Sequence, residues 1–140
     1  MLYDLHNRIK DELLATNQIN KVTWGDIFDI DLERKNDYAL AHIIYQSANV
    51  NGAYNTFQID IIFADMVTDS ANNRMDVLNN LLIVATRIAK SFDGGELYDF
   101  GYRIDPNPNL EPFNERFEMN LSGWTLSMTI NVPNDISRCN

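Results

Sequence analysis

The sequence of 140 residues contains a single cysteine and no long apolar run. Cys139 alone cannot form a disulfide within the chain, so the fold does not depend on an oxidising compartment. No apolar segment approaches the roughly 20 residues of a membrane-spanning helix. The N-terminal segment carries charges throughout and lacks the continuous apolar core of a signal peptide. We therefore expect a soluble protein that is made inside the cell and has no membrane partner.

Basic residues are also few, since 11 Lys and Arg stand against 20 Asp and Glu and give a formal net charge of −9. Binding to nucleic-acid phosphates requires clustered Lys and Arg, and those of this chain are scattered. The acidic balance has two interpretations. It keeps the surface solvated, or it forms a negative patch that meets a basic partner.

Residues suited to catalysis are sparse. A catalytic nucleophile needs a neighbouring base, and the chain has only two histidines, His6 and His42. We interpret His42 as a core or interface residue because it lies in an apolar segment, and His6 as an exposed residue of the first helix. Their spacing does not match a zinc site. Gly94-Gly95 lacks the spacing and the lysine of a phosphate-binding loop, so we predict no cofactor.

The carboxylates offer two weaker alternatives. Asp60 and Asp65 flank a predicted strand and could pair for acid–base catalysis, although scattered acids are weak indicators in a chain with 20 of them. Asp29, Asp31 and Glu33 alternate with apolar residues and could form a cation site. The spacing and glycine of a calcium loop are absent there, which favours a solvated strand face. We predict no catalytic or metal-binding residues and no enzymatic activity.

The segment from Tyr54 to Gly95 is predicted to organise the fold. Its first part alternates apolar and polar residues with a period of two, which is typical of a strand. A helix is predicted next, because apolar residues recur at steps of three and four: Met75, Leu78, Leu81, Leu82, Ala85, Ile88, Ala89 and Phe92. Asp69 or Ser70 is a candidate N-cap, and Gly94-Gly95 is a candidate C-terminal stop.

The rest of the chain predicts one more helix and several strands. Leu2, Leu5, Ile9 and Leu13 form the apolar stripe of a helix over residues 1–16. Strands are predicted within 28–33, 38–45, 96–105, 113–119 and 124–132. In the last of these, apolar residues alternate with hydroxyl residues, which is typical of an antiparallel sheet covered on one side. We therefore predict one α+β domain over 1–140: a mainly antiparallel sheet with an N-terminal helix and one long central helix packed on one face.

Two connections stand out. Asn51-Gly52 predicts a hairpin turn, because both residues tolerate positive φ. The polar segment from Gln46 to Asn49 also fits a longer turn or a protruding hairpin over about 45–56. Three prolines at 106, 108 and 112 predict a loop over 105–112.

Several features favour contact with other protein copies. The segments LAHIIY and IDIIFADMV are apolar on both sides and need more cover than one helix provides. Trp24, Tyr45, Tyr54 and Tyr98 are large side chains of the kind enriched at interfaces, although such residues more often belong to the core.

The order of elements, together with FQIDIIFADMVTDSANNRMDVLNNLLIVATRIAK (57–90) and LSGWTLSMTINVPND (121–135), resembles a family of bacteriophage proteins. These are the tail-terminator and tail-completion proteins, which form head–tail neck rings in tailed bacteriophages, including crAss-like phages of Bacteroidetes. The resemblance covers about residues 1–133. It lies in the topology and carries no residue motif, so no functional residue is transferred.

The resemblance implies a structural virion protein, made in the cytoplasm of the bacterial host, that forms a ring of six or twelve copies between portal and tail. Its partners would be other neck, tail and portal proteins, and DNA would pass non-specifically through a lumen lined by acidic side chains. The hairpin and the proline-rich loop supply the candidate contacts between subunits: Val50, Asn51, Gly52, Tyr54, Pro106, Pro108 and Leu110. The alternative function is a small α+β ligand- or protein-binding module of a cellular complex, with a closed apolar pocket behind the strand of Trp124.

Overall fold

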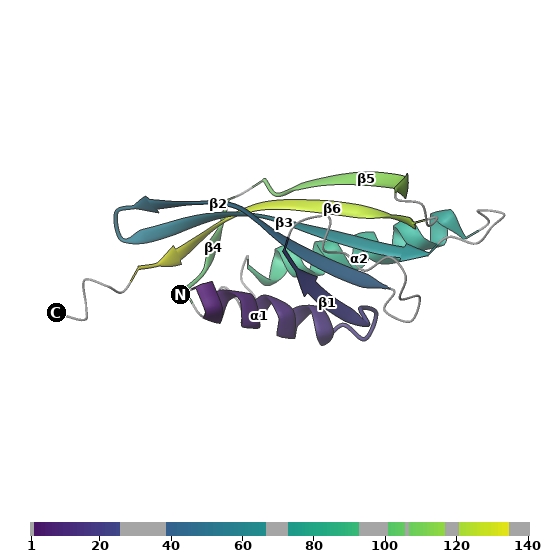
Figure 1. Cartoon of the computed structure of the whole chain (residues 1–140), viewed down its shortest axis with the longest axis horizontal. Coiled ribbons are helices and arrows are strands. Elements are labelled where there is room, and N and C mark those ends of the chain that lie inside the picture. The colour runs from purple at the N-terminus through teal and green to yellow at the C-terminus, as the bar shows by residue number, and fades with distance from the viewer. Residues whose placement is uncertain are drawn as a thin grey trace.

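The computed structural model describes residues 2–25, 39–66, 73–92, 101–105, 107–116 and 121–134, with the backbone alone at 113–116. Two helices and six strands lie in these residues (Figure 1). In chain order they are α1 Leu2–Leu14, β1 Lys21–Trp24, β2 Leu40–Asn51, β3 Tyr54–Met66, α2 Arg74–Ser91, β4 Arg103–Ile104, β5 Asn109–Arg116 and β6 Leu121–Pro133.

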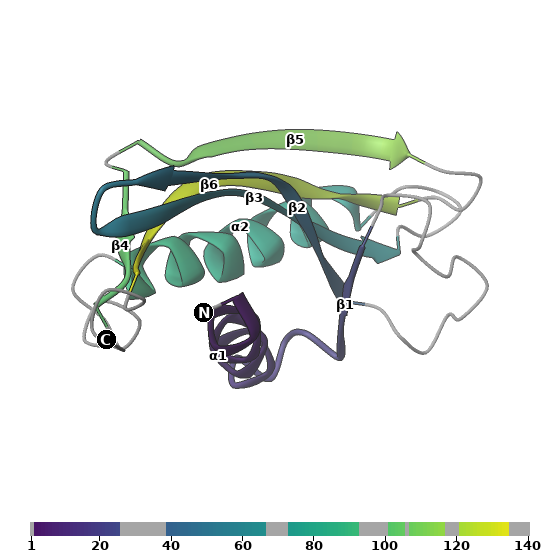
Figure 2. The same cartoon turned by 60° about the vertical axis from the view of Figure 1, so that its left-hand side comes forward.

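The strands form one sheet with the order β1-β2-β3-β6-β4, and β5 also pairs with β6. All of these pairs are antiparallel except β1 with β2. Figure 2 shows α1 and α2 on the same side of the sheet. The prediction of an α+β fold with a mostly antiparallel sheet is confirmed.

The hydrophobic core lies between the sheet and the helices. Alternate residues of β3 and β6 face it, and the register places them side by side, for example Phe63 opposite Trp124 and Ile61 opposite Leu126. From α1 the core receives Leu5, Ile9 and Leu13, which are fully buried, whereas Leu2 is 44% exposed. Because each buried Leu, Ile or Phe side chain contributes about 1.5–3 kcal/mol, this cluster supplies most of the driving force for folding.

The sheet is also buried on its opposite face near β1. There Leu40, His42, Ile62 and Ala64 have at most 3% of their surface exposed. The apolar second faces of β2 and β3 are therefore enclosed here within the chain. These segments do have cover beyond one helix, as predicted, and at these residues the chain itself supplies it.

The buried face of helix α2 overlaps the predicted stripe in part. Leu81, Ala85, Ile88 and Phe92 are buried as predicted, whereas Met75 is 73% exposed. Val77 and Val84 are buried although they were not predicted. Apolar residues occur on more than one side of this segment, so the helical period alone does not fix the edge of the stripe.

The ends of α2 also differ from the prediction. Asn73 occupies the N-cap position, and its side chain makes no capping hydrogen bond. Its Nδ2 instead donates to the Met66 carbonyl (3.3 Å), which joins the end of β3 to the start of the helix. The C-cap residue is Phe92, in the right-handed helical region. Asp69, Ser70 and Gly94-Gly95, the predicted cap and stop, lie outside the described residues.

Strand β2 is longer than predicted. It continues through the polar segment to Asn51, which pairs with Tyr54. The turn is therefore Gly52-Ala53, one residue later than the predicted Asn51-Gly52. Gly52 has φ +62°, and glycine at the first turn position suits a type II′ hairpin. A bulge at Gln46 absorbs the extra residue between the two strands.

The proline-rich segment contributes a strand as well as a connection. Asn109 to Pro112, predicted as loop, belong to β5. A strand tolerates Pro112 because, among the described residues, β5 pairs only with β6, and proline is acceptable at a sheet edge. Before β5 begins, the Asp105 N–H donates to the Thr129 carbonyl (3.0 Å).

The remaining predicted strands overlap the structure only in part. The segment 28–33 lies outside the described residues, and the observed strand nearby is β1, which was not predicted. Of the predicted 96–105 segment, the structure describes 101–105, where β4 has two residues.

Candidate functional site

The outer part of the β2–β3 hairpin, residues 46–58, forms an arm that is poorly covered by the rest of the chain. Every residue of β2 from Gln46 to Asn51 is exposed, and Figure 1 shows the hairpin extending beyond the end of α1. Val50 is 77% exposed and Tyr54 is 41% exposed. The structure therefore places the four predicted contact residues of the hairpin at the surface.

The two faces of the arm differ in chemistry. Ala48 pairs with Phe57 and Val50 with Asn55, which places Ala48 and Val50 on the face that carries the helices elsewhere in the sheet. Ser47, Asn49 and Asn51 lie on the opposite face. No Asp, Glu, Lys or Arg occurs from residue 44 to 59 or from 121 to 134, in a chain that is 22% charged. The arm is thus an uncharged surface on an acidic protein.

The outer edge of β2 lacks a partner strand along the arm in the described part of the chain. Strand β1 pairs with Leu40 to Ile43, and the Gly25 N–H donates to the Ile43 carbonyl (3.0 Å). Beyond Ile43, no strand of the described residues pairs with this edge. Exposed edge groups of this kind can accept another strand.

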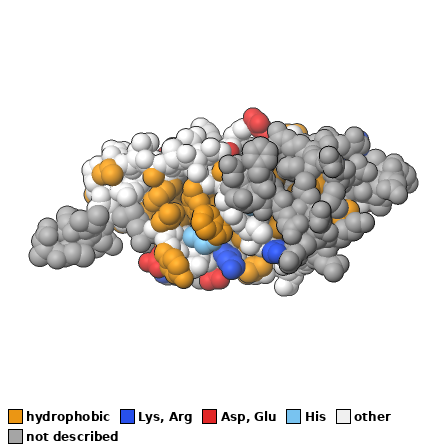
Figure 3. Space-filling model, viewed as in Figure 1, with side chains coloured by type: hydrophobic (Ala, Val, Ile, Leu, Met, Phe, Trp, Pro, Cys, Tyr) orange, Lys and Arg blue, Asp and Glu red, His pale blue; other side chains and the backbone are white. Residues whose placement is uncertain are grey.

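An aromatic cluster of His6, Trp24 and Tyr45 lies where α1, β1 and β2 meet. His6 Nδ1 and the Tyr45 hydroxyl are hydrogen-bonded (2.7 Å), and the His6 ring meets the Trp24 ring edge-on, with centroids 5.8 Å apart. Trp24 is 64% exposed. Figure 3 shows hydrophobic side chains gathered around the histidine on this face.

The cluster changes the titration of its members. Burial lowers the pKa of His6, and the nearby charge of Lys10 lowers it further. Burial raises the pKa of Tyr45 far above its ordinary value, so the hydroxyl stays protonated. The sequence prediction of an exposed His6 is wrong, because His6 is partly buried between these rings. Only the prediction of Trp24 and Tyr45 as possible interface residues pointed to this cluster.

The other predicted polar residues serve the fold. His42 is fully buried, and its Nδ1 is hydrogen-bonded to Thr23 Oγ1 (2.7 Å) across the β1–β2 pair. This agrees with its interpretation as a core residue.

Asp60 and Asp65 do not form an acid–base pair. They are five residues apart on β3, so they lie on opposite faces of the sheet. Asp60 accepts a hydrogen bond from Gln46 Nε2 (2.9 Å). Burial raises the pKa of Asp65, which accepts a hydrogen bond from the Met66 N–H (2.8 Å).

The sheet face opposite the helices is polar over β3 and β6. It carries Thr56, Gln58 and Asp60 of β3. These residues pair with Asn131, Thr129 and Ser127 of β6, respectively, which lie on the same face. Thr56 Oγ1 donates to Asn131 Oδ1 (2.7 Å). Hydroxyl and amide groups outnumber acids among these residues, so the charge of −9 is not concentrated here.

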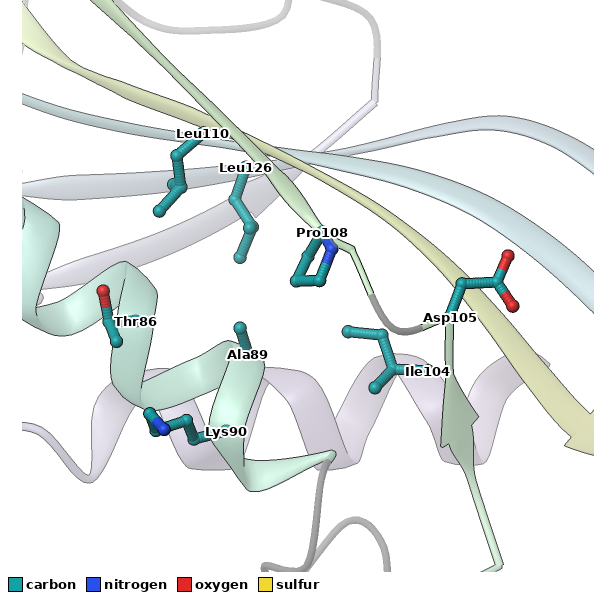
Figure 4. Close-up of a pocket in the computed structure, with 8 residues that line it drawn as sticks. All are labelled: Thr86, Ala89, Lys90, Ile104, Asp105, Pro108, Leu110 and Leu126. Carbon is teal, nitrogen blue, oxygen red and sulfur yellow. The ribbon is translucent and has the colours of Figure 1, made fainter.

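A cavity of about 440 Å³ lies at the other edge of the sheet, between α2 and strands β4, β5 and β6. Figure 4 shows apolar side chains pointing into it from the helix and from the strands, among them Ala89, Pro108 and Leu126. Leu110 also lines it, together with Lys90 and Asp105, which are exposed. Of the predicted contacts in the proline-rich segment, the cavity therefore contains Pro108 and Leu110. Pro106 lies outside the described residues.

A second cavity of about 340 Å³ shares Asp105 and Pro108 with the first. It is lined mainly by polar residues, including Gln58, Ser127 and Thr129. Neither cavity is lined by His42 or Asp60. Trp124 donates its Nε1–H to the Leu78 carbonyl (2.8 Å), which fixes β6 against α2.

Comparison with protein-family models finds no matching family, and comparison with curated proteins finds no matching sequence. In the described part of the chain, no three His, Cys, Asp or Glu side chains come together to hold a metal ion. Over the same residues, neither helix combines the length and the hydropathy needed to cross a membrane.

Proposed function

We propose that the protein is a structural virion component that forms a ring of six or twelve copies in the neck or tail of a tailed bacteriophage. In this role it acts as a tail terminator or head–tail connector, joining the portal and head to the tail around the DNA channel. The N-terminal helix and α2 on one face of the sheet support the proposal, because the resemblance to tail terminators implies such an arrangement. The observation that carries the proposal is the exposed, uncharged arm with its unpaired β2 edge.

The arm favours assembly over action on a substrate for a physical reason. An exposed strand edge free of charge and proline is prone to pair with other chains, and proteins usually protect such edges. Residues 44–51 of β2 contain neither a charge nor a proline, and their one irregularity is the bulge at Gln46. An edge left this open is consistent with a strand that is covered in an assembly.

The polar sheet face fits the passage of DNA. A surface of hydroxyl and amide groups with few positive charges gives no phosphate-binding sites, so DNA would move along it without being retained. In the proposed ring this face, or the acidic residues elsewhere on the chain, lines the lumen.

The cavity beside β6 supports the second candidate function, a small ligand-binding module. Its volume of about 440 Å³ lies within the range of small-molecule sites. Ala89→Trp would fill the cavity. Loss of ligand-induced chemical shifts in this variant, for a small apolar compound that binds the wild type, would support the module.

The composition of purified phage particles tests the proposed function directly. We expect quantitative mass spectrometry of particles from the phage that encodes the chain to find six or twelve copies per particle. Absence of the chain from particles that retain their portal and tail proteins would refute the proposal.

A further inference from the structure

Two mainly apolar regions on the helix side of the sheet leave room for a partner. One is the arm, where Ala48 and the 77% exposed Val50 extend beyond α1. The other is the 440 Å³ cavity, where α2 leaves space beside the partly buried Leu110 and the fully buried Leu126, with Lys90 and Asp105 also in its lining. They belong to opposite edges of the sheet, because β2 lies toward one end of the strand order and β5 pairs with β6 at the other.

The strand directions allow these two regions to meet between copies. Strands β2 and β6 run in the same direction, since each is antiparallel to β3, and β4 is antiparallel to β6. Strand β4 is therefore antiparallel to β2. Ala48 pairs with Phe57, Phe57 with Ile130, and Ile130 with Ile104, so the arm and β4 lie at the same level along the sheet. When a second copy is placed alongside in the same orientation, the arm of one copy lies antiparallel to β4 of the next, beside Ile104 in the cavity wall, and the helices stay on one side.

Charge favours the same contact. Two copies that each carry a net charge of −9 repel one another, and the repulsion is weakest where the approaching surface has no charge. Residues 44–59 are such a surface. Strand β4, at the level of the arm, has only 2 residues, so we expect side-chain packing, more than strand pairing, to hold this contact.

We propose that Ala48 and Val50 of one copy pack into the cavity formed by α2, β4, β5 and β6 of a second copy. This inference rests on the proposed ring function and specifies the surfaces that join its subunits. The contact is head-to-tail, since the two surfaces differ, and a repeated head-to-tail contact closes into a ring when the rotation between copies allows it.

Disulfide trapping tests the geometry. In a Cys139→Ser background, Val50→Cys would be placed on one chain and Thr86→Cys, in the cavity wall, on a second chain with a different affinity tag. We expect oxidation to join the two kinds of chain, and to leave each variant unlinked when it is alone. Preferential Val50→Cys self-linking, which would indicate a symmetric β2–β2 pair, or no linking at all would overturn the proposal.

Charge insertion provides a second test. Val50→Lys places a charge on the arm, and Met75→Lys places the same charge at a residue of α2 with nearly equal exposure, 73% against 77%. We expect Val50→Lys to weaken self-association in sedimentation equilibrium by about tenfold or more, because it removes a buried valine from the contact. Met75→Lys should change it less than twofold.

Equal effects of the two variants, or a wild-type chain that is monomeric at every concentration tested, would contradict the head-to-tail contact. The proposed virion function is judged separately. If the chain is present in particles at six or twelve copies and these tests fail, the ring stands and its subunits are joined through other surfaces.

Discussion

Gly123 is the residue at which the sheet tolerates change least. An ideal Cβ built on Gly123 would lie 1.7 Å from the Phe63 carbonyl oxygen and 2.8 Å from the Phe63 carbonyl carbon. Close carbon–oxygen contacts in proteins are about 3.3 Å, so Gly123→Ala requires a backbone movement of about 1.6 Å. Strand β6 cannot shift freely, because Gly123 pairs with Ala64 of β3 on one side and with Phe113 of β5 on the other.

The expected cost follows from these contacts. Overpacking in a filled interior costs about 1–3 kcal/mol, and one or two weakened strand hydrogen bonds add about 0.5–1.5 kcal/mol each. Alanine also lowers the conformational entropy of the unfolded chain, which offsets about 0.4–1 kcal/mol of this cost. We therefore expect Gly123→Ala to lower the free energy of unfolding by about 2–3 kcal/mol.

Urea unfolding followed by far-UV circular dichroism measures this change. Ser127→Ala, on the same strand and partly exposed, is the matched control and should stay within about 0.5 kcal/mol of the wild type. A Gly123→Ala protein as stable as the control would show that β3 and β6 do not approach as closely as described.

Three further predictions concern the helices and the arm. Val77→Ala should destabilise the protein by about 1–3 kcal/mol in urea unfolding, whereas Met75→Ala should have almost no effect, because α2 buries Val77 and exposes Met75; the reverse order would contradict this orientation of the first turn of α2. The depressed pKa of folded His6 means that the unfolded chain binds its proton more readily, so stability should fall as the pH drops below 6.5, and His6→Gln should show a smaller fall in urea titrations across that range. Gly52→Ala should cost about 1–2 kcal/mol, because the turn needs φ +62° although there is open space for a methyl group; an unchanged midpoint of urea unfolding would mean that the turn adopts another conformation.

The sequence predicted the parts of the fold that depend on local periodicity. Alternation in β3 and β6 and the spacing of Leu5, Ile9 and Leu13 each identify one buried face, and the structure confirms these faces. In α2 the predicted stripe includes the buried Leu81, Ala85 and Ile88, but periodicity could not decide between Met75 and Val77 at the start of the helix. Both are apolar, and only the position of the sheet decides which of them is buried.

Tertiary contacts explain what the sequence did not predict. Gln46 to Asn49 have weak strand preference, yet β3 holds them in a strand after a bulge at Gln46. The aromatic cluster joins His6 to Tyr45, which are 39 residues apart, and no periodic pattern reports such a contact. The cavity likewise arises from three separate parts of the chain. The lack of charge from residue 44 to 59, by contrast, can be read from the sequence. Only the structure shows that residues 46–58 within this segment form an exposed arm.

Hydrogen exchange of the arm amides tests most directly whether other copies cover this surface. The backbone N–H groups of Ser47 to Asn51 would be compared between dilute chain and the assembled state, with those of Ile59 to Phe63 in the core as the internal reference. We expect exchange in the arm to slow on assembly while exchange in the core stays the same. Arm amides that exchange equally fast in both states would contradict the account.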